Sequence, residues 1–189
     1  MVNFWRSIRF TLVFAVILGL LYPLLVAGIG NVLFPFQAGG SIVSWQGRPV
    51  GSLLIAQRTT LPGLFQPRPS AVGYAANASG GSNLGPTNPA LVAEVKGNLQ
   101  AVLRQNPGVT AAAVPTDMVE SSASGLDPDI SMPNALLQVP RVARATGLSE
   151  AALRQLIDRE ETRPVLGIWG EPMVNVMRLN LAIVKRTGR

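Results

Sequence analysis

A long uncharged stretch near the N-terminus constrains the fold of this chain most strongly. No charged residue occurs from Phe10 to Gly47, and the part from Phe10 to Phe36 is apolar apart from Thr11, Asn31 and several Gly and Pro residues. A helix of about 20 mostly apolar residues is long enough to span a bilayer. We therefore expect a transmembrane helix over residues 10–36.

The charges that flank this stretch predict its orientation. Arg6 and Arg9 precede it, whereas the first positive charge that follows it is Arg48. Positive charge concentrates on the cytoplasmic side of membrane spans. We therefore expect residues 1–9 in the cytoplasm and one extracytoplasmic domain over residues 37–189.

A cleaved signal peptide is the alternative interpretation, with Leu25-Val26-Ala27 as its cleavage site. The apolar run continues past that site to Leu33, which is longer than the core of about 7 to 15 residues typical of signal peptides. This length favours a retained helix. Pro23 removes a backbone donor and is expected to kink the helix. Gly19, Gly28 and Gly30 either face lipid or form a packing face, together with Pro23, for another transmembrane helix, and we favour the packing face.

Composition excludes several classes of protein. The chain has no Cys and no His, so thiol chemistry, disulfides and the commonest general base and metal ligand are absent. The formal charge is +6, but the basic residues are scattered rather than clustered with aromatic residues, which argues against nucleic-acid binding.

The segment Gln66–Pro89 has no hydrophobic period and is rich in Gly and Pro. It is therefore expected to be a long loop, and loops of this length are usually functional or disordered. Disorder fits poorly, because Phe65, Tyr74 and Leu84 supply apolar anchors and the segment has a single charge, Arg68.

The rest of the sequence predicts an α+β fold. A hairpin is expected over residues 40–57 with its turn at Gln46-Gly47, and a helix from the N-cap Asn88 to Asn106. Further along we expect a short strand at 111–114, a helical turn at 115–120 and a second small-residue loop at 121–131. A helix at 133–146 should break or kink near Pro140. The last expected elements are a helix from the N-cap Ser149 to Glu160, a strand at 173–176 and a helix at 179–185.

The candidate ligand-binding residues each have a structural alternative. Gly80-Gly81 lacks the Lys of a phosphate-binding P-loop, so Gly80, Gly81 and Gly85 are expected to supply turns with positive φ. In that interpretation Ser79, Ser82, Asn83 and Asn88 bond the loop's own backbone. Asp127 and Asp129 could bind a cation, but a turn and a helix cap are favoured.

Catalysis by this chain is disfavoured. Ser70 and Ser122 could act as nucleophiles only with a base, and there is no His. Arg141 and Arg144, one helical turn apart, are expected to form a solvated face or a docking contact, and Glu160 and Glu161 to face solvent. Two hypotheses remain: a membrane-anchored, non-catalytic interaction module, which is favoured, and an extracytoplasmic serine hydrolase using Lys or Asp.

Ordered motifs run along almost the whole chain. They are Tyr22-Pro23, Phe34-Pro35-Phe36-Gln37-Ala38, the run from Gly51 to Gln57, Arg68-Pro69-Ser70-Ala71 with Tyr74, the run from Ala78 to Pro86 with Asn88-Pro89, the run from Ser122 to Pro128, the run from Gln138 to Val142, and Val174-Asn175-Val176. Together these motifs resemble one family, the C subunit of the Kdp potassium-transporting ATPase, and the resemblance implies a place in the bacterial cytoplasmic (inner) membrane. Ala56 departs from the Gly expected there.

The resemblance implies one non-catalytic subunit of a high-affinity potassium uptake pump. Its partners would be an ATP-hydrolysing P-type subunit, a potassium-selective channel-like subunit and a small membrane subunit. No cofactor is expected on this chain itself, because ATP and potassium would be handled by the complex. The family's role is seen either as a catalytic chaperone that raises ATP affinity, with nucleotide binding, or as an extracytoplasmic scaffold or gate.

The expected topology bears on this choice, because ATP is cytoplasmic and the long loop is expected outside. We expect the loops at 68–88 and 122–129 to form a docking face, with any effect on ATP affinity transmitted through the assembly. The residues expected to contact partners or ligands are Arg68, Pro69, Ser70, Tyr74, Ser79, Gly80, Gly81, Ser82, Asn83, Leu84, Asn88, Ser122, Ser124, Gly125, Asp127, Gln138 and Arg141.

Overall fold

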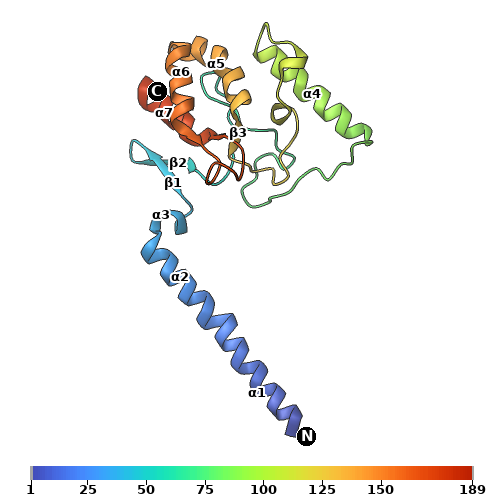
Figure 1. The fold of residues 1–189 in the computed structure, drawn as a ribbon, viewed down its shortest axis with the longest axis vertical. Coiled ribbons are helices and arrows are strands. Elements are labelled where there is room, and N and C mark those ends of the chain that lie inside the picture. The colour runs from blue at the N-terminus through green and yellow to red at the C-terminus, as the bar shows by residue number, and fades with distance from the viewer. Residues whose placement is uncertain (1, 189) are drawn as a thin grey trace. The chain divides into compact units, whose positions relative to one another are not determined.

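The structure, a computed structural model, describes residues 2–188. The chain divides into two compact units, Met1–Ile42 and Val43–Arg189 (Figure 1), and each is described by itself. The predicted fold class is confirmed: one long apolar N-terminal helix precedes a small α+β domain.

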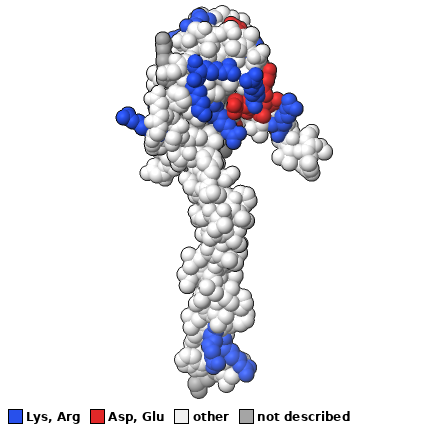
Figure 2. Space-filling view, turned by 90° about the vertical axis from the view of Figure 1, so that its left-hand side faces the viewer, with Lys and Arg blue, Asp and Glu red and all other residues white. Residues whose placement is uncertain are grey.

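The first unit is dominated by a helix that runs continuously from Val2 to Leu33. It comprises α1 (Val2–Val16), a π-helical turn η1 (Ile17–Leu21) and α2 (Tyr22–Leu33), and the short α3 (Pro35–Ala38) follows. Basic side chains lie at the N-terminal end of this helix, and the rest of it carries no charge (Figure 2). The helix is long and apolar enough to cross a membrane, and no residue of its apolar 18-residue stretch is buried. The membrane boundaries at residues 10 and 36 remain predictions.

The expected disruption at Pro23 takes the form of the π-helical turn. The Tyr22 backbone N–H donates to the carbonyl oxygen of Ile17, five residues earlier. Pro23 has no N–H, and in a regular helix its ring would clash with the carbonyl of Gly19. The wider turn relieves this clash while keeping the helix continuous.

The second unit begins with the predicted hairpin of β1 (Ile42–Trp45) and β2 (Arg48–Ser52). Gln46 and Gly47 both have positive φ, the conformation that tight two-residue hairpin turns require. The second strand was expected over residues 50–55, but it begins at Arg48 and ends at Ser52.

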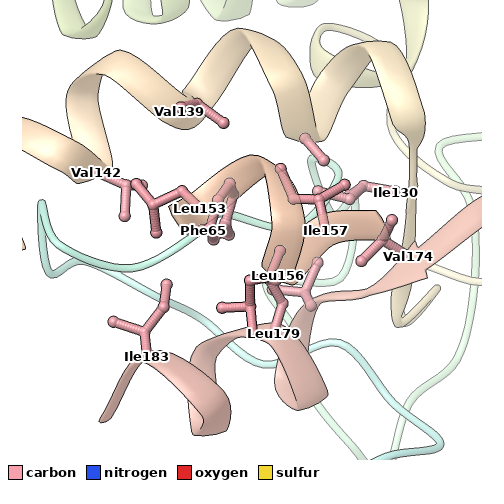
Figure 3. Packing of buried hydrophobic residues seen from close by; sticks show 12 residues of the cluster. Phe65, Ile130, Val139, Val142, Leu153, Leu156, Ile157, Val174, Leu179 and Ile183 are labelled. Carbon is pink, nitrogen blue, oxygen red and sulfur yellow. The ribbon is translucent and has the colours of Figure 1, made fainter. Parts of the chain in front are cut away.

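The core lies between three helices and a small antiparallel sheet. The helices are α5 (Met132–Thr146), α6 (Glu150–Glu160) and α7 (Val176–Thr187), and the strand order is β3-β5-β4, from β3 (Asp129–Ser131), β5 (Met173–Asn175) and β4 (Glu161–Thr162). Figure 3 shows the side chains that fill the space between them. Those labelled are Phe65, Ile130, Val139, Val142, Leu153, Leu156, Ile157, Val174, Leu179 and Ile183. Phe65 joins them from the chain immediately before the long loop, so the start of the loop is anchored in the core.

Helix α4 (Pro89–Gln105) lies beyond this core and contains no buried residue. The predicted caps of α4 and α6 are confirmed: Asn88 accepts a hydrogen bond from the Ala90 N–H, and Ser149 accepts one from the Ala152 N–H. Leu148 and Leu153, placed as a hydrophobic staple, both pack into the core.

Several boundary predictions were wrong. Ala111–Ala113 is a 3-10 helix (η2) rather than a strand, whereas the predicted helical turn is confirmed as η3 (Thr116–Met118). α5 continues through Pro140 without a break, and α7 begins at Val176 because Asn175 caps it by accepting from the Arg178 N–H. Strands β3 and β4 were not anticipated, and the Glu161 side chain, on β4, is only 18% exposed.

Candidate functional site: a two-loop platform

The long loop and the second small-residue loop are fastened to each other. We call residues 66–89 and 122–129 together the two-loop platform. The Ser70 hydroxyl donates to the carbonyl oxygen of Gly125 at 2.6 Å, and the Ser122 N–H donates to the carbonyl of Pro69 at 3.2 Å. The carbonyl of Ser124 accepts from the Gly80 N–H at 2.8 Å and from the Ser79 hydroxyl at 3.1 Å.

An ion pair closes one side of the platform. Arg68 Nη1 lies 3.1 Å from Asp127 Oδ2, and the two side chains are 24% and 27% exposed. Asp127 Oδ1 also accepts from the Asp129 N–H. Asp127 therefore stabilises a turn, which is the structural role favoured from the sequence. Asp129 does not cap a helix: it begins β3 and accepts from the Asn175 side chain.

Tyr74 fixes the turn inside the longer loop. Its N–H donates to the Ser70 hydroxyl, and its phenol donates to the carbonyl of Arg68 at 2.9 Å. The Arg58 guanidinium lies over its ring, 5.5 Å from the centroid. Burial raises the pKa of the Tyr74 phenol, and the positive charge of Arg58 opposes that rise.

Two glycines permit the close approach of the loops. A Cβ at Gly81 would lie 2.9 Å from the carbonyl oxygen of Ala123, and one at Gly125 would lie 2.7 Å from that of Gly80. The expectation of positive φ at Gly80, Gly81 and Gly85 was wrong, because in this loop Gly73, Tyr74 and Asn83 adopt it. Gly81 is required for space between two backbones and not for a turn.

The remaining predicted platform residues differ in exposure and in role. Leu84 is half-buried, Asn83 is exposed, and Asn88 caps α4. Within the described residues the side chains of Ser82 and Asn83 form none of the backbone hydrogen bonds expected of them. Ser122 is only 3% exposed, so it lies inside the platform.

Gln138 and Arg141 form a separate buried cluster on α5. They are 1% and 7% exposed. Gln138 accepts from the Gln66 N–H and donates to the Gln66 carbonyl, while Arg141 donates to Gln138 and to the carbonyls of Pro62 and Leu64. The predicted solvated face was therefore wrong for Arg141, whereas Arg144 is exposed. A docking contact at these residues stays a prediction. Burial, and then repulsion from Arg144, lower the pKa of Arg141 to about 10.

Two polar residues that were not singled out from the sequence also shape this region. Asn180 accepts from the Phe65 N–H and donates to the Phe65 carbonyl, which secures the chain entering the loop. Asp117 accepts from the Ser131 N–H and hydroxyl and from Asn134. The hydrophobic periodicity of the sequence does not reveal such contacts, because each contact joins two separate segments of the chain.

The arrangement suits a preformed surface better than a reaction centre. A groove of about 590 Å³ beside the loops is lined by Leu54, Ile55, Arg68, Ser79, Ser122, Ala123, Ser124, Leu126, Asp127 and Pro128. Its one cation, Arg68, is already paired with Asp127. In the part of the chain that the structure describes, no three acidic residues gather as metal ligands.

Comparison with known proteins identifies the family. Residues 4–185 match the family described as KdpC, the K+-transporting ATPase c chain. The chain belongs to the KdpC family. The potassium-transporting ATPase KdpC subunit of Caldanaerobacter subterraneus subsp. tengcongensis is 50% identical over 180 residues, covering 95% of this chain and 93% of the relative.

Other relatives carry the same description. The KdpC subunit of Polaromonas naphthalenivorans is 52% identical over 174 residues, covering 90% of this chain and 88% of the relative. That of Caulobacter vibrioides is 49% identical over 176 residues, covering 92% and 88%. The chain is therefore an accessory subunit of the potassium-transporting ATPase complex and not its catalytic subunit.

Proposed function

We propose that this KdpC-family chain supports ATP-driven potassium uptake by docking companion subunits through the two-loop platform, on the side of the membrane opposite to ATP. The observation that carries the proposal is the set of bonds that join the two loops: Ser70, Ser79, Gly80, Ser122 and the Arg68–Asp127 pair all connect one loop to the other. Polar groups already paired within the platform are not free to bind phosphate.

The charge around the apolar helix supports the placement. Arg6 and Arg9 precede the helix and no positive charge follows it until Arg48. This asymmetry favours a cytoplasmic N-terminus and an extracytoplasmic platform. The companion subunits that the platform would meet are the ATP-hydrolysing and potassium-selective chains.

An effect on ATP affinity would then pass through the assembly as coupling between distinct sites. This is how the domain could act as a catalytic chaperone without touching nucleotide. The second candidate is direct nucleotide binding by the Gly80-Gly81 loop, and it is disfavoured because the Gly80 N–H and the Ser79 hydroxyl already donate to the carbonyl of Ser124. ATP titration of the full-length chain alone in nanodiscs should give no saturable binding.

A steric variant tests docking directly. Ala78 is exposed on the platform, and Ala151 is exposed on α6. Ala78→Arg should lower the companion subunits retained on purification by about tenfold or more. Ala151→Arg is the matched control and should retain them fully, with both variants keeping the thermal midpoint of the parent chain. Equal retention in the two variants would remove the platform from the interface.

A further inference from the structure

A small apolar projection follows β4, and we call residues 164–170 the apolar finger. Val165, Leu166, Ile168 and Trp169 are 63–80% exposed. Other large apolar residues exposed in the described part of the second unit occur singly, at Val50, Leu54, Leu61 and Val92. Single exposed apolar residues are ordinary, but a contiguous group marks an interaction site.

The finger has a fixed shape. Val165 and Trp169 exchange backbone hydrogen bonds of 2.8 and 3.1 Å, the Gly167 N–H donates to the carbonyl of Pro164, and the Ile168 N–H donates to that of Val165. Pro172 restricts the chain just beyond the finger. A turn that is already held in one conformation loses less conformational entropy when it docks into a matching cleft.

Leu166 is the most informative residue of the finger. Its φ is +54°, in the left-handed region that Asn or Gly adopts more easily. Leu166 is also 80% exposed, so the side chain stabilises no core in this chain. A large apolar residue at a strained, solvent-facing position has no stabilising role within the chain, which favours a contact with another molecule.

We propose that the apolar finger inserts into an uncharged apolar cleft on a companion subunit of the ATPase. Membership in the KdpC family implies a multi-chain complex, whose companion subunits are the surfaces that the finger would meet. A bilayer is the other apolar surface within reach of a tethered domain, but a fluid surface has no shape for a preformed turn to match. The finger also lacks the basic excess that draws loops to anionic lipid, because its flanking charges are one Arg163 and one Glu171.

Thiol protection tests the proposal in the full-length chain, which has no native Cys. Leu166→Cys and Ile168→Cys are labelled with a maleimide in three settings: the chain alone in detergent, alone in nanodiscs, and in the assembled pump. Labelling is read after the chains are separated by electrophoresis. Gln155→Cys, exposed on α6, is the control.

The finger positions should react about tenfold more slowly only in the assembled pump, while Gln155→Cys reacts equally in all three settings. Equal rates in all settings would overturn the proposal. Protection already present in nanodiscs without companion subunits would also overturn it, in favour of the bilayer.

A second variant separates docking from folding. Leu166→Asn suits positive φ and removes the apolar contact. The thermal midpoint of the chain alone should stay constant or rise, while the retention of companion subunits falls by about fivefold or more. Full retention would contradict docking by the finger and leave the platform proposal, tested at Ala78, unaffected.

Discussion

Residue 81 has no room for a side chain, because a Cβ there would lie 2.9 Å from the carbonyl oxygen of Ala123. Gly81 belongs to the long loop and Ala123 to the second loop. The short distance between these two backbones shows that the two loops of the platform pack directly against each other.

Gly81→Ala should separate the two loops. The added methyl group meets backbone, which cannot rotate away, so we expect the free energy of unfolding to fall by about 1–3 kcal/mol. Gly85→Ala is the matched control, because nothing lies within 4 Å of its Cβ position and its φ is not positive. The control should be neutral or stabilising by less than about 1 kcal/mol. Denaturant unfolding measures both, and equal stability of the two variants would contradict the packing described.

Arg141 and Arg144 should respond to the same substitution with opposite signs. Arg141→Gln leaves the carbonyls of Pro62 and Leu64 without their donor, and we expect a loss of about 3 kcal/mol or more. Arg144→Gln removes the repulsion that lowers the pKa of Arg141 and should stabilise the protein by less than about 1 kcal/mol. Thermal unfolding of the two variants measures the difference. A mild loss at Arg141 would mean that its side chain does not hold residues 62–64 in place.

Asp129 predicts a defined pH dependence. Burial, and secondarily the charge of Asp127, raise the pKa of Asp129 above its usual 3.8, against the Asn175 hydrogen bond and the charge of Arg178. A raised folded-state pKa contributes stability that is present below pH 3.8 and is lost as the pH rises through the folded value. Asp129→Asn keeps an acceptor for Asn175 and removes this loss, so the variant should match the parent at pH 3 and exceed it at pH 7.

Asp127→Asn is the control for that experiment. It removes the negative charge that faces Arg68 at 3.1 Å, so it should lower stability at pH 7. Thermal midpoints of the parent chain and of both variants, measured from pH 3 to pH 7, test these two expectations. An Asp129→Asn variant less stable than the parent at pH 7 would show that its charge is favourable in the folded state.

Local patterns in the sequence predicted the elements that depend on local chemistry. Asn88 and Ser149 were found as caps because they precede helical periods, and Gln46-Gly47 was found as a turn because it separates two apolar runs. Strand β4 was missed because two residues are too few to display an alternation. Strand β3 was missed because Asp129–Ser131 ends a run of small and polar residues that was assigned to a loop. α5 tolerates Pro140 because tertiary packing of Val139 and Val142 outweighs the local cost of proline.

The candidate site was predicted in its location but not in its internal roles. The motif residues identified the two loops, whereas their pairing arises from hydrogen bonds between positions about 45 to 55 residues apart. The burial of Arg141 was also invisible, because sequence records the charge but not the carbonyls of Pro62 and Leu64 that require a donor. The apolar finger was not predicted, because the sequence does not show whether four neighbouring apolar residues are buried in the core or exposed to solvent.

Docking on the side opposite to ATP requires the platform to lie outside the cytoplasm, and this location can be measured. Asn83→Cys, exposed on the platform, and Ser7→Cys, within α1, would be labelled in intact spheroplasts with a membrane-impermeant thiol reagent, and again after permeabilisation. We expect Asn83→Cys to react in intact spheroplasts and Ser7→Cys to react only after permeabilisation. The reverse pattern would contradict it, because the platform would then share a compartment with ATP and direct nucleotide contact would become the better explanation.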